Sequence, residues 1–460
     1  MGPYTALMDE CKLVLQGTLA DFVASLDAGQ EGGQRAHGSL VERFRQLPVL
    51  WDQMLDLFKV DTFSKQIQGP LLTKVAASDR RGRPLGQCLN FATQDYLALS
   101  YHPAIRQAAI DAIETHGVHA AGSPALVGNS VPSVSLERAM SQWLGMNECV
   151  LFPTGWGACF GAVKALVRRT DHVVLDELAH ASLQEGARAA TNSVFAFRHL
   201  CVNSLERRLK RLRAQDPSGG ILVVTESLYS MDSDVPDLRA HQELAHRYGA
   251  NLLVDVAHDL GVLGRAHGLG ALEVQGVLGQ IDLVVGSFSK AFAANCGFVA
   301  SNHPGLKLAM RFGSGPNTFS TAPSPIQTAV ALKGLEIVQS SEGFACRQRI
   351  VERSTALRDT LTGMGLQVLG QPSAIVPVLM GGVARSRLTA RFMVEQGVLV
   401  NLVEHPAVAR NTSRLRLQLM ATHEPEHLQA CAEALGAAIG QADGMLREIN
   451  AGRDPQSQLV

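Results

Sequence analysis

Between residues 86 and 330, short apolar runs alternate with stretches in which apolar residues recur at helical spacing. The apolar runs have the length of strands, and the amphipathic stretches include 205–213 and 238–248. The runs lie at 149–152, 172–176, 220–226, 252–255 and 283–285. Strands that alternate with helices in this way predict an α/β domain with a large, mainly parallel sheet and helices on both faces.

The regions on either side of this domain have different patterns. Residues 1–85 predict a helical N-terminal extension, with helices over 10–26 and 40–58. Beyond residue 340, helices and short strands are mixed, which predicts a small C-terminal α+β domain. Its expected elements are helices at 346–364, 387–396 and 425–449, and strands at 367–369, 375–379, 398–402 and 415–419. We therefore expect an extension at 1–85, a large domain at 86–340, a small domain at 341–449 and a loose tail at 450–460.

Composition narrows the class of protein. Of the 460 residues, 46% are hydrophobic and 18% charged, which suits a globular enzyme with a large core. The formal net charge of −1 gives no reason to expect nucleic acid or an anionic membrane as a partner. No apolar run is long enough for a transmembrane helix, and the first residues lack a secretion signal. The 8 cysteines form no Cys-x-x-Cys pair, which favours reduced thiols in a cytoplasmic protein.

One basic run stands out before the large domain. Residues 78–84 contain three arginines and a Gly-x-Pro turn signal. A solvated turn is the simplest interpretation, and a phosphate-binding loop is the alternative.

The most informative stretch is a lysine that follows a strand and a hydroxyl-rich turn. Lys290 comes after the apolar run 281–285, with Ser287 and Ser289 just before it. A lysine can form a Schiff base with an aldehyde, and hydroxyls beside it can hold a phosphate. Upstream, Asp255 ends the strand-like run 252–255, about one strand–helix–strand unit earlier. Functional groups gather at the carboxyl ends of strands in such sheets, and an aspartate there could keep a pyridine nitrogen protonated. Together these features suggest pyridoxal phosphate.

Ser-x-Ser-Lys on its own is a weak signal, because a lysine in such a turn is usually a solvated surface group. Several further motifs in a fixed order make the assignment more specific. They are Asn90–Leu99 (NFATQDYLAL), Phe152–Cys159 (FPTGWGAC), Asp176–Ser182 (DELAHAS), Thr225–Asp234 (TESLYSMDSD), Asp255–His258 (DVAH) and Ser413–Glu424 (SRLRLQLMATHE). With this ordered set, residues 86–440 resemble the α-oxoamine synthases, a fold-type-I pyridoxal-phosphate family.

The resemblance implies roles for individual side chains. Lys290 would carry the cofactor, Asp255 would pair with the ring nitrogen and His180 would stack on the ring. His258 and Ser230 would lie at the phenolic oxygen. The phosphate would be held by Gly155, Trp156 and Ser287, with a contribution from Thr321 of the other subunit. This last role implies a homodimer with shared active sites. Arg416, or as second choice Arg414, would bind the substrate carboxylate with its planar guanidinium.

The resemblance also implies the reaction. A small amino acid (alanine, glycine or serine) would condense with an acyl thioester, delivered by coenzyme A or a carrier protein, to give an α-amino ketone and carbon dioxide. Two alternatives remain open. One is another fold-type-I reaction, such as that of an aminotransferase or an aldol-type lyase. The other is a non-catalytic partner subunit, against which the retained Lys290 argues.

Several positions depart from the family's pattern. Pro124 stands near the place of a loop arginine, Val256 replaces an acid and Asp259 replaces a serine. Cys159 stands where asparagine is common. We expect these changes to affect the choice of substrate more than the chemistry.

Overall fold

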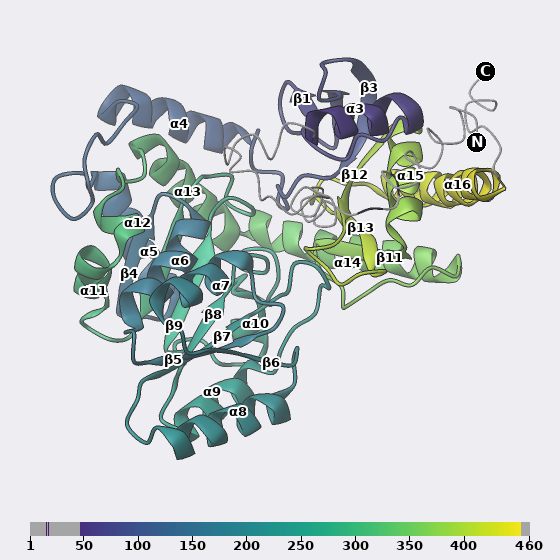
Figure 1. Ribbon diagram of the computed structural model, residues 1–460. Helices are drawn as coiled ribbons and strands as arrows, with labels where there is room; N and C mark the ends of the chain where they lie inside the picture. The colour runs from purple at the N-terminus through teal and green to yellow at the C-terminus, as the bar shows by residue number, and fades with distance from the viewer. Residues whose placement is uncertain (1–14, 16, 18–46, 452–460) are drawn as a thin grey trace, which may run out of the picture. The chain divides into compact units, whose positions relative to one another are not determined.

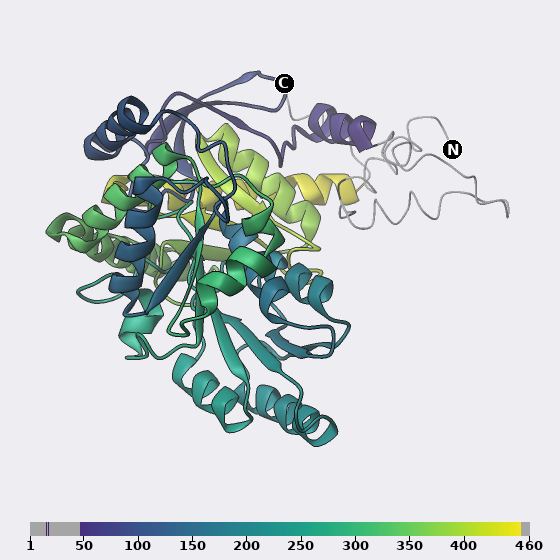
Figure 2. The same cartoon turned by 90° about the vertical axis from the view of Figure 1, so that its left-hand side faces the viewer.

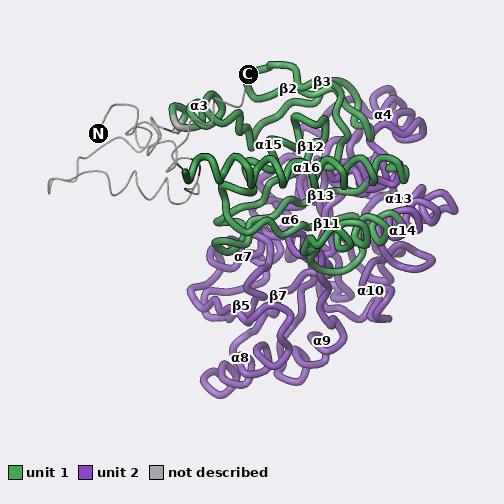
Figure 3. The backbone as a smooth tube through the Cα atoms, turned by 90° about the vertical axis from the view of Figure 1, so that its right-hand side faces the viewer, with its two compact units in different colours: residues 1–93, 353–419, 423–460 green, residues 94–352, 420–422 purple. Residues whose placement is uncertain are grey.

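The computed structural model describes residues 15, 17 and 47–451 (Figure 1). The chain forms two compact units, which Figure 3 colours separately. Unit 1 consists of the described parts of 1–93, 353–419 and 423–460, and unit 2 consists of 94–352 and 420–422.

Unit 2 is built on a seven-stranded sheet in the order β4-β10-β9-β8-β7-β5-β6. The strands are β4 (Glu148–Phe152), β5 (His172–Asp176), β6 (Val194–Phe197), β7 (Ile221–Glu226), β8 (Asn251–Asp255), β9 (Leu283–Ser287) and β10 (Gly297–Ser301). The five strands from β9 to β6 are parallel, and β10 is antiparallel to both β9 and β4. The carboxyl ends of β7, β8 and β9 therefore lie side by side at one edge of the sheet.

Helices cover both faces of this sheet, and the teal strands run between them in Figures 1 and 2. One face packs against α6 and α7 around a core that includes Val150, Val224 and Val285. The helices of this unit are α4 (Pro103–His116), α5 (Val131–Leu144), α6 (Gly155–Leu166), α7 (Ala181–Ala190), α8 (Val202–Gln215), α9 (Leu238–Arg247), α10 (Gly270–Val274), α11 (Leu306–Gly313), α12 (Gly315–Thr318) and α13 (Pro325–Gln339). The helix α14 (Ser341–Gly363) begins in unit 2 and ends in unit 1. Every residue of β7 and β9 is buried, which explains why the sequences of such strands are continuous apolar runs.

Unit 1 contains a six-stranded sheet in the order β1-β2-β3-β12-β13-β11. Its strands are β1 (Gln66–Gln68), β2 (Lys74–Ser78), β3 (Pro84–Phe91), β11 (Ile375–Gly381), β12 (Val398–Val403) and β13 (Ser413–Gln418). Its other helices are α3 (Leu47–Phe58), α15 (Val383–Glu395) and α16 (Pro425–Asn450), and their apolar faces share one core with Leu415 and Leu417 of β13.

The fold class predicted from the sequence is confirmed, and the details differ in three places. The region predicted as a helical extension also contains strands: β1, β2 and the start of β3 lie within residues 66–85, and β3 pairs with β2 and with β12 of the small sheet. The units divide after residues 93 and 352 rather than 85 and 340, so the extension and the small domain belong to one unit. The edge strand β6 and the antiparallel strand β10 were missed. The predicted helix at 10–26 and most of the tail lie outside the described residues.

Candidate active site

A cavity of about 320 Å³ opens in unit 2 at the carboxyl ends of β7, β8 and β9. Most of the residues singled out from the sequence line it: Gly155, Trp156, Cys159, His180, Asp255, His258, Ser287 and Lys290. They come from four separate parts of the chain, and the parallel sheet brings them together. Glu226, Ser182 and Ser289 also line it.

Lys290 and Asp255 provide the central pair of charges. Lys290 follows β9 and is partly exposed, while Asp255 is the last residue of β8 and only 6% exposed. The Asp255 carboxylate accepts a hydrogen bond from the amide of Ala257 at 2.9 Å, which fixes its orientation at the strand end. A buried carboxylate beside a lysine can hold a cationic ring nitrogen while the lysine bears the reacting carbon.

His180 lines the cavity and is held there through both its imidazole and its backbone amide. It is the N-cap of α7, and its imidazole Nδ1 lies 2.7 Å from the Ser182 hydroxyl. Its amide donates to Glu226 Oε1 at 2.6 Å. Burial, together with the negative charge of Asp255 on the neighbouring strand, raises the pKa of Glu226 well above its usual value. The exposed imidazole is thus positioned to cover a flat ring.

His258 is positioned by a tyrosine that the sequence analysis did not single out. The Tyr96 hydroxyl lies 3.0 Å from His258 Nδ1, and both residues are buried. Tyr96 belongs to the motif at 90–99, so a signal was present. Its contact with a residue 162 positions away could not be read from the sequence.

The turn before α6 and the end of β9 form a cradle for an anion. A Cβ on Gly155 would come within 2.5 Å of Ser287 Cβ, so only glycine permits this close approach. Thr154 caps α6 by accepting from the Gly157 amide at 2.9 Å, so that amide is already engaged. The amides of Gly155 and Trp156 then remain as candidate phosphate ligands, at a helix N-terminus that favours negative charge. The Ser287 hydroxyl is the third candidate; it lies 2.7 Å from the Ser289 hydroxyl and accepts from the Ser289 amide at 3.2 Å.

Four predicted site residues are not among those lining this cavity. Ser230 is buried in the turn after β7, and Thr321 is exposed after α12. Arg414 and Arg416 belong to unit 1, where they alternate along β13 with the core residues Leu415 and Leu417. Their side chains therefore share the opposite face of that sheet. All six residues of β13 are buried, and the strand lies between β12 and β11, so neither arginine lies on an edge of the sheet.

Three of the positions that depart from the family pattern, Val256, Asp259 and Cys159, differ in whether they can contact a substrate. Val256 is buried beside Gly286, where an added Cβ would lie 3.1 Å from Val256 Cγ2. Asp259 accepts from the Ala271 amide at 2.7 Å and lies 2.5 Å from the Ser227 hydroxyl. Burial raises the pKa of Asp259 to about 6. Both are internal packing positions, whereas Cys159 lines the cavity.

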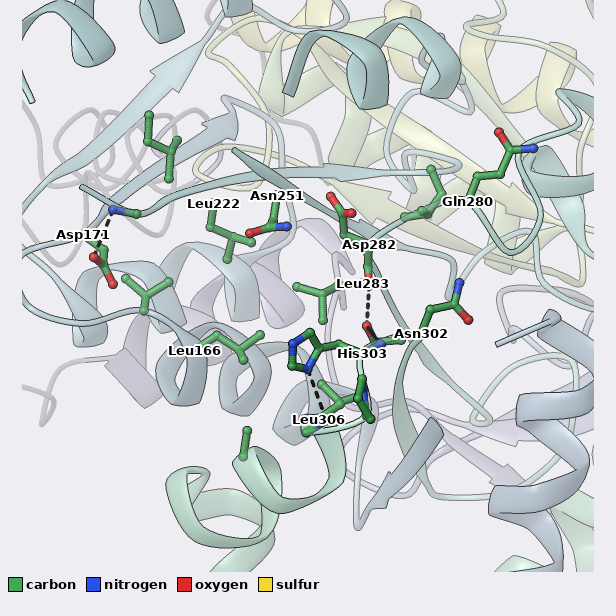
Figure 4. Close-up of a pocket in the computed structure, with 18 residues that line it drawn as sticks. Leu166, Asp171, Leu222, Asn251, Gln280, Asp282, Leu283, Asn302, His303 and Leu306 are labelled. Carbon is green, nitrogen blue, oxygen red and sulfur yellow. Dashed lines mark hydrogen bonds between the residues drawn. The ribbon is translucent and has the colours of Figure 1, made fainter. Parts of the chain in front are cut away.

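A larger cavity, of about 650 Å³, lies at the opposite edge of the same sheet (Figure 4). Its floor is aliphatic and includes Leu222, Leu283 and Leu306. Asp282 there accepts from the Leu252 amide, and His303 accepts from the Gly305 amide, so these groups hold strand ends and turns. This cavity lacks the lysine–carboxylate pair, and we assign the chemistry to the smaller one.

Other sequence features have structural explanations. In unit 1, Arg80 and Arg81 pair with Asp52 and Asp56 of α3 at 2.5 and 2.7 Å, which supports the solvated-turn interpretation of residues 78–84. Across residues 47–451, no group of His, Cys, Asp and Glu has the arrangement of a metal site. No helix among the described residues has both the length and the apolar character needed to cross a membrane.

Comparison with known proteins agrees with this geometry. Residues 86–435 match the aminotransferase class I and II family. The chain is 34% identical to 8-amino-7-oxononanoate synthase of Geobacter sulfurreducens, over 77% of this chain and 89% of that protein. It is 31% identical to serine palmitoyltransferase of Sphingobacterium spiritivorum, over 88% and 98%. A solved serine palmitoyltransferase structure that contains pyridoxal phosphate superposes with a TM-score of 0.81 and 29% identity, covering 88% of this chain and all of that one.

The chain belongs to the aminotransferase class I and II family of fold-type-I pyridoxal-phosphate enzymes and, within it, to the α-oxoamine synthases. Its cofactor is pyridoxal phosphate. The cavity residues fit this group, because a lysine, a buried carboxylate and a glycine-only phosphate cradle converge on one cavity.

Proposed function

We propose that this protein is a C-acyltransferase that condenses a small amino acid with an acyl thioester and releases the amino acid's carboxylate as carbon dioxide. The observation that carries the proposal is the convergence of Lys290, Asp255 and His180 on a cavity whose floor includes the Gly155–Ser287 cradle. Alanine, glycine and serine are all candidate amino acids, and coenzyme A or a carrier protein could deliver the acyl group.

Each side chain has a proposed task. Bound pyridoxal phosphate supplies an aldehyde for the substrate amine and a ring that withdraws electrons from the α-carbon. Asp255 keeps the ring nitrogen protonated, and His180 covers the ring face. His258, held by Tyr96, hydrogen-bonds the phenolic oxygen, with Ser230 as a second candidate. Lys290 Nζ would be the base that removes the α-proton of the bound amino acid.

The phosphate and the substrate carboxylate require further ligands. Gly155, Trp156 and Ser287 hold the phosphate, with Thr321 of a second subunit completing the group. Arg416 is the first choice for the carboxylate, since it lies on the face of β13 away from the apolar core. Arg414 lies on the same face and is the second choice.

We also propose a homodimer with shared active sites. Unit 2 exposes large apolar side chains at Leu126, Val127, Phe312 and Phe319, each at least 80% exposed. The segments that carry them are connected, because the Ser123 hydroxyl donates to the Thr318 carbonyl at 2.6 Å. Contiguous exposed apolar side chains are typical of protein interfaces. Sedimentation equilibrium of the wild type and Phe319→Glu tests this: a dimer that the variant weakens is expected, and a monomeric wild type would contradict it.

A cytoplasmic location is part of the proposal. The cysteines in the described part of the chain are all free thiols, as expected in a reducing compartment.

The direct test uses the loaded enzyme with 1-¹³C-alanine, glycine or serine and acyl thioesters of graded length. Thiol release and labelled carbon dioxide are measured together. We expect equal amounts of both for one amino acid, and neither with Lys290→Ala. An aminotransferase would give a keto acid without thiol release, and an aldol-type lyase would give an aldehyde. A non-catalytic subunit would give no product with any pair.

A further inference from the structure

Cys159 is the one departure from the family pattern that contacts the proposed catalytic machinery directly. It lies in the second turn of α6, is only 4% exposed and lines the cavity. Its Sγ donates to Asp255 Oδ2 at 3.2 Å. The other carboxylate oxygen, Oδ1, accepts from the Ala257 amide at 2.9 Å. Each oxygen of Asp255 is therefore held by a donor from a different part of the chain.

The chemistry of this donor differs from that of the asparagine common at this position in the family. A thiol is a weak hydrogen-bond donor, whereas an amide or a hydroxyl is a stronger one. A hydrogen bond to a carboxylate stabilises its charged form and reduces its basicity, and a weaker donor reduces it less. Burial, together with the negative charge of Asp255, raises the pKa of the Cys159 thiol, so that the sulfur keeps its proton and remains a donor.

We propose that Cys159 is a positioning residue that fixes the orientation of the Asp255 carboxylate while leaving it strongly basic. The carboxylate can then hold the ring nitrogen of pyridoxal phosphate in its protonated form more firmly than it could beside an amide. This inference rests on one part of the proposed function, the pairing of Asp255 with the ring nitrogen.

The competing explanation is that Cys159 only fills space between α6 and β8. Four variants separate the two roles. Cys159→Ser keeps nearly the same size but provides a stronger donor, and Cys159→Asn introduces the residue common in the family. Cys159→Ala removes the donor. Cys149→Ser is the matched control, because Cys149 is also a buried thiol of this unit and lies in β4.

The measurement is the ¹⁵N chemical shift of ring-labelled pyridoxal phosphate bound to each protein, followed as a function of pH. We expect the midpoint for ring-nitrogen deprotonation to fall by about one pH unit in Cys159→Ser and Cys159→Asn, the scale of one hydrogen bond. In Cys159→Ala the midpoint does not fall, and the cofactor dissociation constant rises about tenfold because Asp255 loses its fixed orientation. Cys149→Ser behaves as the wild type.

Two results would overturn the proposal, and they differ in whether the proposed function also fails. Equal midpoints in the wild type and Cys159→Ser would show a space-filling role, with the proposed function unaffected. A wild-type protein that binds no pyridoxal phosphate would contradict the proposed function itself, and the inference with it.

Discussion

Gly155 is the position where the geometry makes the sharpest prediction. In Gly155→Ala the new Cβ would lie 2.5 Å from Ser287 Cβ and 2.6 Å from Ser287 Oγ, distances that real Cβ atoms do not show. Ser287 ends β9, and its Cβ and backbone Cα, the latter 3.3 Å from the new atom, cannot turn away as the tip of a flexible side chain would. The turn and the strand end must therefore move apart, which separates the two sides of the phosphate cradle.

The cost follows from this overlap. Inserting one methyl group into a closely packed site costs about 1–3 kcal/mol. If the cradle opens only as far as the methyl requires, the loss appears as weaker phosphate binding, about 5- to 150-fold in the dissociation constant at 1.4 kcal/mol per factor of ten. Part of the strain also lowers the melting temperature of the cofactor-free protein.

Absorbance titration of the cofactor-free protein with pyridoxal phosphate measures this effect. Gly440→Ala is the matched control, because a Cβ there meets no atom within 4 Å and the position lies inside α16. The control should bind the cofactor as the wild type does and gain slightly in stability from its helical alanine. A Gly155→Ala protein with wild-type affinity would refute the phosphate cradle.

Three further predictions follow from other contacts. His199 Nδ1 lies 2.8 Å from Asp176 and its Nε2 3.1 Å from Asp234, and these carboxylates raise the pKa of His199 from 6.5 to about 10 against the opposing effect of burial. The stabilisation is thus complete below pH 6.5 and lost as the pH rises towards about 10, so the melting-temperature difference from His199→Gln should shrink between pH 6.5 and 10 and be absent above pH 10; a constant difference would contradict the assignment. Tyr96→Phe should lower kcat about tenfold or more while leaving the melting temperature within a few degrees, because only the hydroxyl at His258 is lost; equal losses in both would indicate a structural role. Arg416→Lys should raise the amino acid KM more than Arg414→Lys does, and the reverse order would make Arg414 the carboxylate ligand.

The sequence predicted the core of the fold because each buried parallel strand is an apolar run of its own. The strand β10 (Gly297–Ser301) was not predicted, because its antiparallel position between β4 and β9 depends on contacts distant in sequence. No strand was predicted at β2 or β3, because the pairing of β3 with β12 is likewise non-local.

In the candidate site, too, local sequence patterns predicted some residues, whereas contacts between distant parts of the chain were not predicted. Lys290, Asp255 and Gly155 were found because each lies at the end or turn of a recognisable strand, where the sheet topology brings functional groups together. The contacts Tyr96–His258 and Cys159–Asp255 join residues that are 162 and 96 positions apart, and no local pattern encodes them. The roles of Ser230, Thr321, Arg414 and Arg416 remain predictions.

The attachment of the cofactor to Lys290 is the central claim, and borohydride reduction tests it most directly. The protein is saturated with pyridoxal phosphate, reduced, digested and examined by peptide mass spectrometry. We predict a pyridoxyl-phosphate group on the peptide containing Lys290 and on no other lysine, with none in Lys290→Ala. A modified lysine elsewhere, or an unmodified Lys290 peptide from a protein with full cofactor absorbance, would contradict the assignment of this cavity as the active site.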